Sequence, residues 1–111
     1  MSDNDVEDKL EVLADSYSKR ILSGCYRKAK AVQDLSWKYN IPIAACYRKV
    51  KSLREAGFLK IDKKKPSRRG KKTKLYRTTL KKAMIKFEEG EFMVKFRYPN
   101  GETLDVKLDF K

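Results

Sequence analysis

Apolar side chains in the first quarter of the chain recur every three or four residues between Leu10 and Cys25. This spacing gathers them on one side of an α-helix and predicts a scaffold helix. Asp15 offers an N-cap that would divide this scaffold in two. Residues 2–5, before it, are polar or acidic and predict a frayed lead. Gly24 costs a helix about 1 kcal/mol relative to Ala, which indicates close packing at that position.

Two more helical patterns lie between Ala31 and Leu59, separated by a turn too short for independent helices. Asn40 tolerates the left-handed conformation in which helices often end, and Pro42 suits a first helical turn. We therefore expect one helix to end at Asn40 and the next to start at Pro42. Two helices joined so closely are typical of a helix-turn-helix.

The first of these helices has an inward stripe formed by Val32, Leu35 and Tyr39. Trp37 falls off this stripe. We expect it to cover the edge of the core, and the alternative is contact with a partner.

The second helix, residues 42–56, has an apolar stripe and a polar face opposite to it. The stripe, expected in the core, is formed by Ile43, Cys46, Val50 and Leu53. The opposite face carries Ala44, Arg48, Ser52 and Glu55, flanked by Ala45 and Lys51. Small residues let a helix backbone approach base edges in a major groove, and an arginine can bond guanine bidentately. Tyr47 lies between the two faces, either at the margin of the core or as a phosphate contact through its hydroxyl.

Alternating residues after Phe58 predict two strands, FLKID and LYRTT, joined by a basic tip. The tip, residues 63–74, holds eight Lys or Arg and no apolar side chain, so we expect it to be mobile until it orders on phosphates. Its candidate contacts are Lys63, Lys64, Lys65, Arg68, Arg69, Lys71, Lys72 and Lys74. Arg68 or Arg69 is also a candidate for insertion into a minor groove.

Strict alternation in the last third of the chain predicts a three-stranded antiparallel meander over residues 80–111. Turns at residues 89–90 and 99–101 set its register. The predicted pairs are Phe87 with Phe92, Ile85 with Val94, Phe96 with Leu104, and Val94 with Val106. The apolar face so formed carries Ala83, Ile85, Phe87, Phe92, Val94, Phe96, Leu104, Val106, Leu108 and Phe110.

This apolar face is too large to leave in water. It packs either on the chain's own helices or on a second copy, and both remain open. In the second case the chain is a homodimer through residues 80–111, with contacts expected from Phe92, Val94, Phe96, Val106 and Leu108.

Charged residues are unevenly distributed along the chain. Lys and Arg number 28 against 15 Asp and Glu, a net charge of +13 and a pI near 9.8. Between Tyr47 and Lys82 there are 16 basic residues and two acidic ones. Charge so concentrated beside a helix-turn-helix indicates a polyanionic partner.

Three stretches together resemble a known family. LADSYSKRIL (13–22), NIPIAACYRKVKSLREAGFL (40–59) and the basic hairpin resemble the winged helix-turn-helix domains of ArsR-like transcription regulators, particularly small archaeal ones. The resemblance covers residues 12–79, and its most specific part is the run from Cys46 to Leu59. The segment after residue 79 shows no dimerisation helix of the arsenic-sensor type, so the family's dimer geometry is not carried over.

The patterns and the resemblance predict an α+β fold, with a winged helix-turn-helix domain at residues 1–79 and an antiparallel β-meander at residues 80–111. The resemblance implies a transcription regulator that binds specific sequences of double-stranded DNA. Residues 42–56 would enter the major groove, and the basic wing, residues 60–78, would lie on the backbone or in the minor groove.

An RNA-binding or ribonucleoprotein winged helix is the alternative, because the same basic surface suits A-form or single-stranded RNA. The small edge formed by Ala44, Ala45 and Arg48 favours DNA, since the deep, narrow major groove of A-form RNA excludes a helix. We expect no enzyme and no cofactor, because the sequence lacks histidine, a glycine-rich phosphate loop and a paired carboxylate site.

Cys25 and Cys46 fall on apolar stripes and are expected to be buried in the core. A metal site is disfavoured without histidine or a Cys-x-x-Cys spacing, and a redox link between the two cysteines remains open. No apolar run approaches a membrane span and the N-terminus is acidic, so we expect no membrane span, no signal peptide and a cytoplasmic location.

Overall fold

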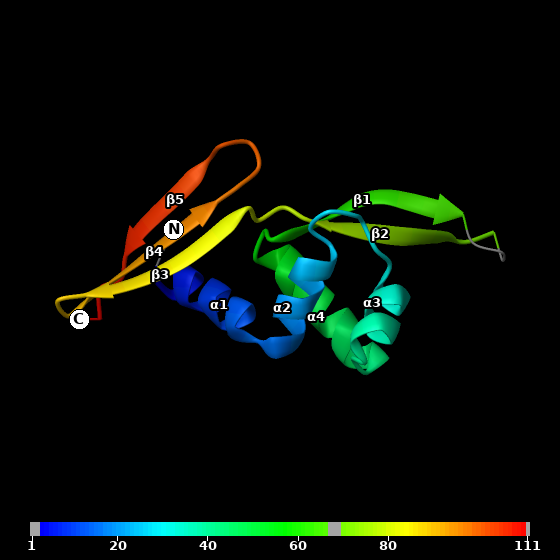
Figure 1. Cartoon of the computed structure of the whole chain (residues 1–111), viewed down its shortest axis with the longest axis horizontal. Helices are drawn as coiled ribbons and strands as arrows, with labels where there is room; N and C mark the ends of the chain where they lie inside the picture. The colour runs from blue at the N-terminus through cyan, green and yellow to red at the C-terminus, as the bar shows by residue number, and fades with distance from the viewer. Residues whose placement is uncertain (1–2, 67–69, 111) are drawn as a thin grey trace.

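The computed structural model describes residues 3–66 and 70–110, and its class is α+β. Within these residues, four helices precede two antiparallel sheets (Figure 1). The helices are α1 (Asp3–Ala14), α2 (Ser16–Gly24), α3 (Val32–Tyr39) and α4 (Ile43–Glu55). The first sheet is a hairpin of β1 (Leu59–Pro66) and β2 (Lys72–Thr78). The second, here called the C-terminal sheet, has the order β3 (Lys82–Glu88), β4 (Glu91–Arg97) and β5 (Thr103–Lys107). The two sheets lie toward opposite ends of an elongated molecule, 56 × 29 × 21 Å, with the helices along one side of both.

The scaffold is divided at Asp15, which is the alternative that the candidate N-cap left open. The Asp15 carboxylate accepts a hydrogen bond of 2.9 Å from the backbone N–H of Ser18 and so caps α2. The predicted frayed lead is wrong from residue 3 onward, because α1 begins there and the fully buried Val6 anchors its first turns in the core. A Cβ at Gly24 would lie 2.6 Å from the hydroxyl of Tyr39, which confirms the close packing expected there.

The turn between α3 and α4 has the predicted form. Asn40 ends α3 in the left-handed conformation, with φ 52°, and Pro42 is the N-cap of α4 rather than its first residue. Most of the apolar stripe of α4 is buried as predicted, and most of the opposite face is exposed. The first turn differs, because Ile43 is 45% exposed and Ala45 only 7%, so both were placed on the wrong side of the helix.

The C-terminal sheet has the predicted register at all four pairs: Phe87 opposite Phe92, Ile85 opposite Val94, Phe96 opposite Leu104, and Val94 opposite Val106. Glu89 and Gly90 both have positive φ, and Gly101 does as well, which fits the two predicted turns. The last strand is shorter than predicted, because β5 ends at Lys107.

One hydrophobic core joins the sheet to the helices. Val94, Phe96 and Leu108 are buried in the same cluster as Val6, and the rings of Phe58 and Phe96 lie 5.4 Å apart. The prediction that Val94, Phe96 and Leu108 belong to a dimer contact is therefore wrong. Only part of the apolar face packs on the chain itself, and its outer part remains exposed.

The hairpin is more regular than predicted. Its strands extend through Pro66 and from Lys72, so most of the tip expected to be mobile is paired strand. A bulge between Ile61 and Lys63 shifts the register. The remaining tip candidates, Arg68 and Arg69, lie outside the described residues.

None of the helices in the described ranges combines the length and the apolar character that a bilayer span needs.

Candidate nucleic-acid interface

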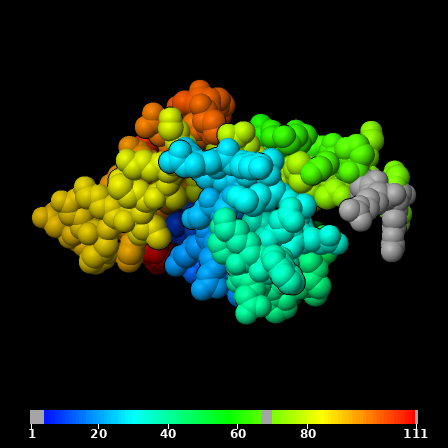
Figure 2. All heavy atoms as spheres, turned by 45° about the vertical axis from the view of Figure 1, so that its right-hand side comes forward, coloured from blue at the N-terminus to red at the C-terminus, as the bar shows by residue number. Residues whose placement is uncertain are grey.

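A groove of about 650 Å³ lies between α4, the start of α3 and strand β2. We call it the α4–β2 groove. Its lining residues are Ala31, Val32, Gln33, Tyr47, Val50, Lys51, Arg54, Lys72, Thr73, Lys74 and Tyr76. In Figure 2 the hairpin strands, green and yellow-green, lie beside the cyan atoms of the α3 region. The groove thus combines a helix face with a strand that is distant in sequence.

Tyr76 lines the groove, and its backbone links β2 to the segment before α3. The backbone N–H of Lys30 donates to the carbonyl of Tyr76 (2.9 Å), and the N–H of Tyr76 donates to the carbonyl of Lys30 (2.8 Å). This bridge fixes β2 beside the start of α3. The Tyr76 ring is buried, and the guanidinium of Arg54 lies 5.8 Å from its centroid, within the range of a cation–π contact.

Four cations and no carboxylate line the α4–β2 groove: Lys51, Arg54, Lys72 and Lys74. Within the described residues, no ion pair engages these four side chains or the other hairpin lysines. The nearest pairs in sequence use Lys49 on one side and Lys86 on the other. Unpaired cations of this kind remain available to a polyanion, which they bind by releasing its counterions.

The predicted site residues fall into four groups. Tyr47, Lys51, Lys72 and Lys74 come together in the groove, and Tyr47 is 55% exposed, which argues against its core-margin alternative. Outside the groove, the exposed ones are Ala44, Arg48, Lys63, Lys64, Lys65 and Lys71. Ser52 is half-buried, and the buried Ala45 cannot meet a partner. Arg68 and Arg69 are outside the described residues.

Four polar lining residues were missed from the sequence: Gln33, Arg54, Thr73 and Tyr76. Arg54 follows Tyr47 by seven residues and Lys51 by three, so helical spacing alone would have found it. The other three carried no signal, because their segments meet α4 only in the folded chain.

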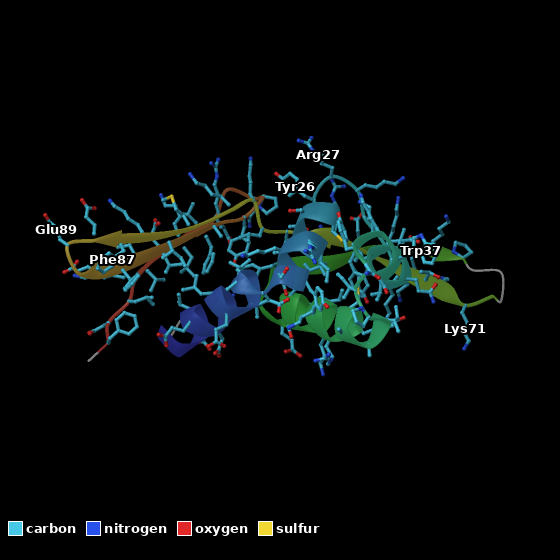
Figure 3. All side chains as sticks on the ribbon, turned by 60° about the horizontal axis from the view of Figure 1, so that its bottom comes forward. Tyr26, Arg27, Trp37, Lys71, Phe87 and Glu89 are labelled. Carbon is cyan, nitrogen blue, oxygen red and sulfur yellow. The ribbon has the colours of Figure 1, made fainter. Side chains whose placement is uncertain are left out.

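We expected Trp37 to cover the edge of the core, but its side chain is 90% exposed. It borders a second, open groove of about 770 Å³ beside the turn between α3 and α4, together with Ile43 and Tyr17. In Figure 3, Trp37 and Lys71 lie toward the hairpin end of the molecule, and Phe87 and Glu89 lie at the far end.

The two cysteines are buried in the core, as predicted. Burial raises the pKa of the Cys25 thiol to about 11 and also raises the pKa of Cys46. The Cys46 thiol donates to the carbonyl of Val32 at 3.6 Å. Both thiols therefore stay protonated near neutral pH, a state unsuited to nucleophilic attack.

No protein-family model matches the chain, and no curated protein matches it.

Proposed function

We propose that this chain is a winged helix-turn-helix protein that binds double-stranded DNA in a sequence-specific manner and regulates transcription. Helices α3 and α4 would be the helix-turn-helix, and the β1–β2 hairpin the wing. The observation that carries the proposal is the α4–β2 groove, where an exposed helix face and a basic strand present four unpaired cations together. The proposal is of a binding protein, not an enzyme.

Helix α4 and the hairpin would each have a role in binding duplex DNA. Helix α4 has 13 residues, and its outward side carries Ala44, Tyr47, Arg48 and Lys51. A helix can enter the major groove, which is about 12 Å wide, and read the base edges there. Cations of the hairpin would then meet the flanking phosphates, which fix register and carry no sequence information directly.

The bridge between Lys30 and Tyr76 supports the wing assignment. It ties the hairpin to the segment before α3, and α3 in turn packs on α4, where the Cys46 thiol donates to the carbonyl of Val32. A tethered hairpin loses less conformational entropy on binding than a free basic loop, which favours affinity.

A competition assay tests the proposal. A labelled duplex DNA is displaced by unlabelled duplex DNA, by duplex RNA of the same sequence, and by single-stranded RNA. We expect duplex DNA to compete best, because A-form RNA offers α4 no accessible major groove. Stronger competition by either RNA would favour the RNA-binding alternative, and absence of binding to all three would overturn the proposal.

A further inference from the structure

An apolar patch remains uncovered at the far end of the C-terminal sheet. It consists of Ile85, Phe87, Phe92 and Phe110, which are 55%, 63%, 36% and 65% exposed. We call it the aromatic patch. The rings of Phe87 and Phe92 lie 4.7 Å apart, and those of Phe92 and Phe110 lie 5.9 Å apart, so three rings form one cluster.

A groove of about 620 Å³ continues the patch toward α1. Besides residues of the patch, this groove is lined by Leu10 and Leu108 and by three acidic residues, Glu7, Asp8 and Glu11. An apolar centre beside a polar rim is the usual anatomy of a protein–protein interface.

The distribution of charge makes this end the one at which two copies of the chain can meet. Residues 15–79 carry twenty basic and four acidic residues, whereas α1 and residues 80–111 together carry eight basic and eleven acidic ones. Two copies of a chain with net charge +13 repel one another least at this end. An anionic polymer is disfavoured there by the same imbalance.

The exposed area is adequate for the centre of a dimer interface. An aromatic side chain offers roughly 150–250 Å². The exposed fractions of the three rings then leave roughly 300 Å² uncovered on each copy, before Ile85 is counted. A standard interface covers about 800 Å² per partner and is a little more than half apolar. The acidic wall of α1 supplies a rim of the required polarity.

We infer that the chain forms a homodimer in which the aromatic patches of two copies meet. The contact is isologous, so that Phe87 and Phe110 of one protomer pack on the same cluster of its partner. The α4–β2 groove shares no lining residue with the groove beside the patch, so the contact does not use the residues of either α4–β2 groove. This inference does not depend on the proposed function.

If the chain also binds DNA as proposed, the geometry constrains the operator. Phe87 of the patch and Lys71 of the hairpin lie toward opposite ends of a molecule 56 Å long (Figure 3). A dimer joined at the patches would present two grooves and recognise two half-sites, whose spacing follows from the angle at which the copies meet.

Sedimentation equilibrium of the full chain without DNA tests the dimer. At tens of micromolar we expect about 26 kDa, twice the 13.0 kDa of one chain. The double variant Phe87→Ser with Phe110→Ser should sediment as a monomer. The control is Met84→Ser with Met93→Ser, because these residues lie on the opposite face of the same sheet and are 44% and 46% exposed. The control should remain a dimer.

Circular dichroism checks the fold of each variant, and Ile85→Lys is the second test if the phenylalanine variant does not fold. It places a charge in the patch at a side chain that is 55% exposed, and it should also dissociate the dimer. A monomeric wild type, a dimeric phenylalanine variant or a dissociated methionine control would each overturn the inference. DNA affinity enters none of these outcomes, so failure of the dimer and failure of the proposed function are distinguishable.

Discussion

Removal of the four cations from the α4–β2 groove should flatten the salt dependence of DNA binding. The variant combines Lys51→Ala, Arg54→Ala, Lys72→Ala and Lys74→Ala. Each cation that neutralises a phosphate contributes about 0.9 to the slope of log K against log salt concentration. Four such contacts therefore account for about 3.6 of this slope. When the salt concentration rises from about 50 to 200 mM, the affinity of the wild type should fall about a hundredfold more than that of the variant.

Fluorescence anisotropy of a labelled random duplex, titrated at several salt concentrations, measures this slope. The matched control removes four lysines from the C-terminal sheet: Lys82, Lys86, Lys95 and Lys107, each replaced by Ala. This control changes the net charge by the same amount at lysines that do not line the groove, and its slope should stay close to that of the wild type.

Two results would refute the reasoning. A groove variant with the slope of the wild type would show that these cations touch no phosphates. Equal flattening in both variants would show that net charge, rather than the groove, sets the affinity.

Three further predictions concern single residues. Arg48→Ala should cost roughly 1–3 kcal/mol on a preferred duplex and little on random DNA, measured by anisotropy; equal losses would make Arg48 a phosphate contact. Asp15→Ala should lower the free energy of unfolding by about 1 kcal/mol in urea titrations, because the cap of α2 is lost, whereas Asp15→Asn keeps a cap and should cost less. Burial raises the pKa of Asp15, but the hydrogen bonds from Ser18 and the pairing with Lys49 outweigh burial and lower the pKa overall. The ionised carboxylate therefore stabilises the fold at any pH above the ordinary pKa of an aspartate. That contribution is lost as the pH falls through the lowered pKa, so the difference in stability between wild type and Asp15→Asn should narrow in acid. A difference that stays constant in acid would contradict this role of Asp15. Cys46→Ser should destabilise the fold by roughly 1 kcal/mol through a buried hydroxyl and leave DNA preference intact; an altered preference would give Cys46 a role beyond packing.

The C-terminal sheet was the part of the fold most accessible to prediction. Its side chains alternate strictly, and its turns contain Gly90 and Gly101, so period and turn chemistry allowed a single register. The split scaffold and the left-handed Asn40 were predictable for a similar reason, because caps are local.

The first turn of α4 was not predictable from the helix alone. The rest of its apolar stripe is buried as the period predicts, but Ala45 is buried and Ile43 is exposed, because the packing of neighbouring elements decides which side of the first turn is covered. Arg54 was missed although helical spacing aligns it with Tyr47 and Lys51.

The hairpin strands were also underestimated. Their outer halves carry no apolar residues, so hydrophobic pattern gives no signal there, and backbone pairing across β1 and β2 holds them instead. The exposure of Trp37 was also not predicted, because large aromatic side chains are usually buried. In the described part of the chain, no residue covers it.

Amide chemical-shift changes in an isotope-labelled chain titrated with duplex DNA test the α4–β2 groove most directly. The largest changes are expected at Tyr47, Lys51 and Arg54 on α4 and along the basic strand β2, with little change in β3 to β5. If the largest changes instead fall in the C-terminal sheet, or if the chain binds the duplex without any change at α4, the groove is not the interface.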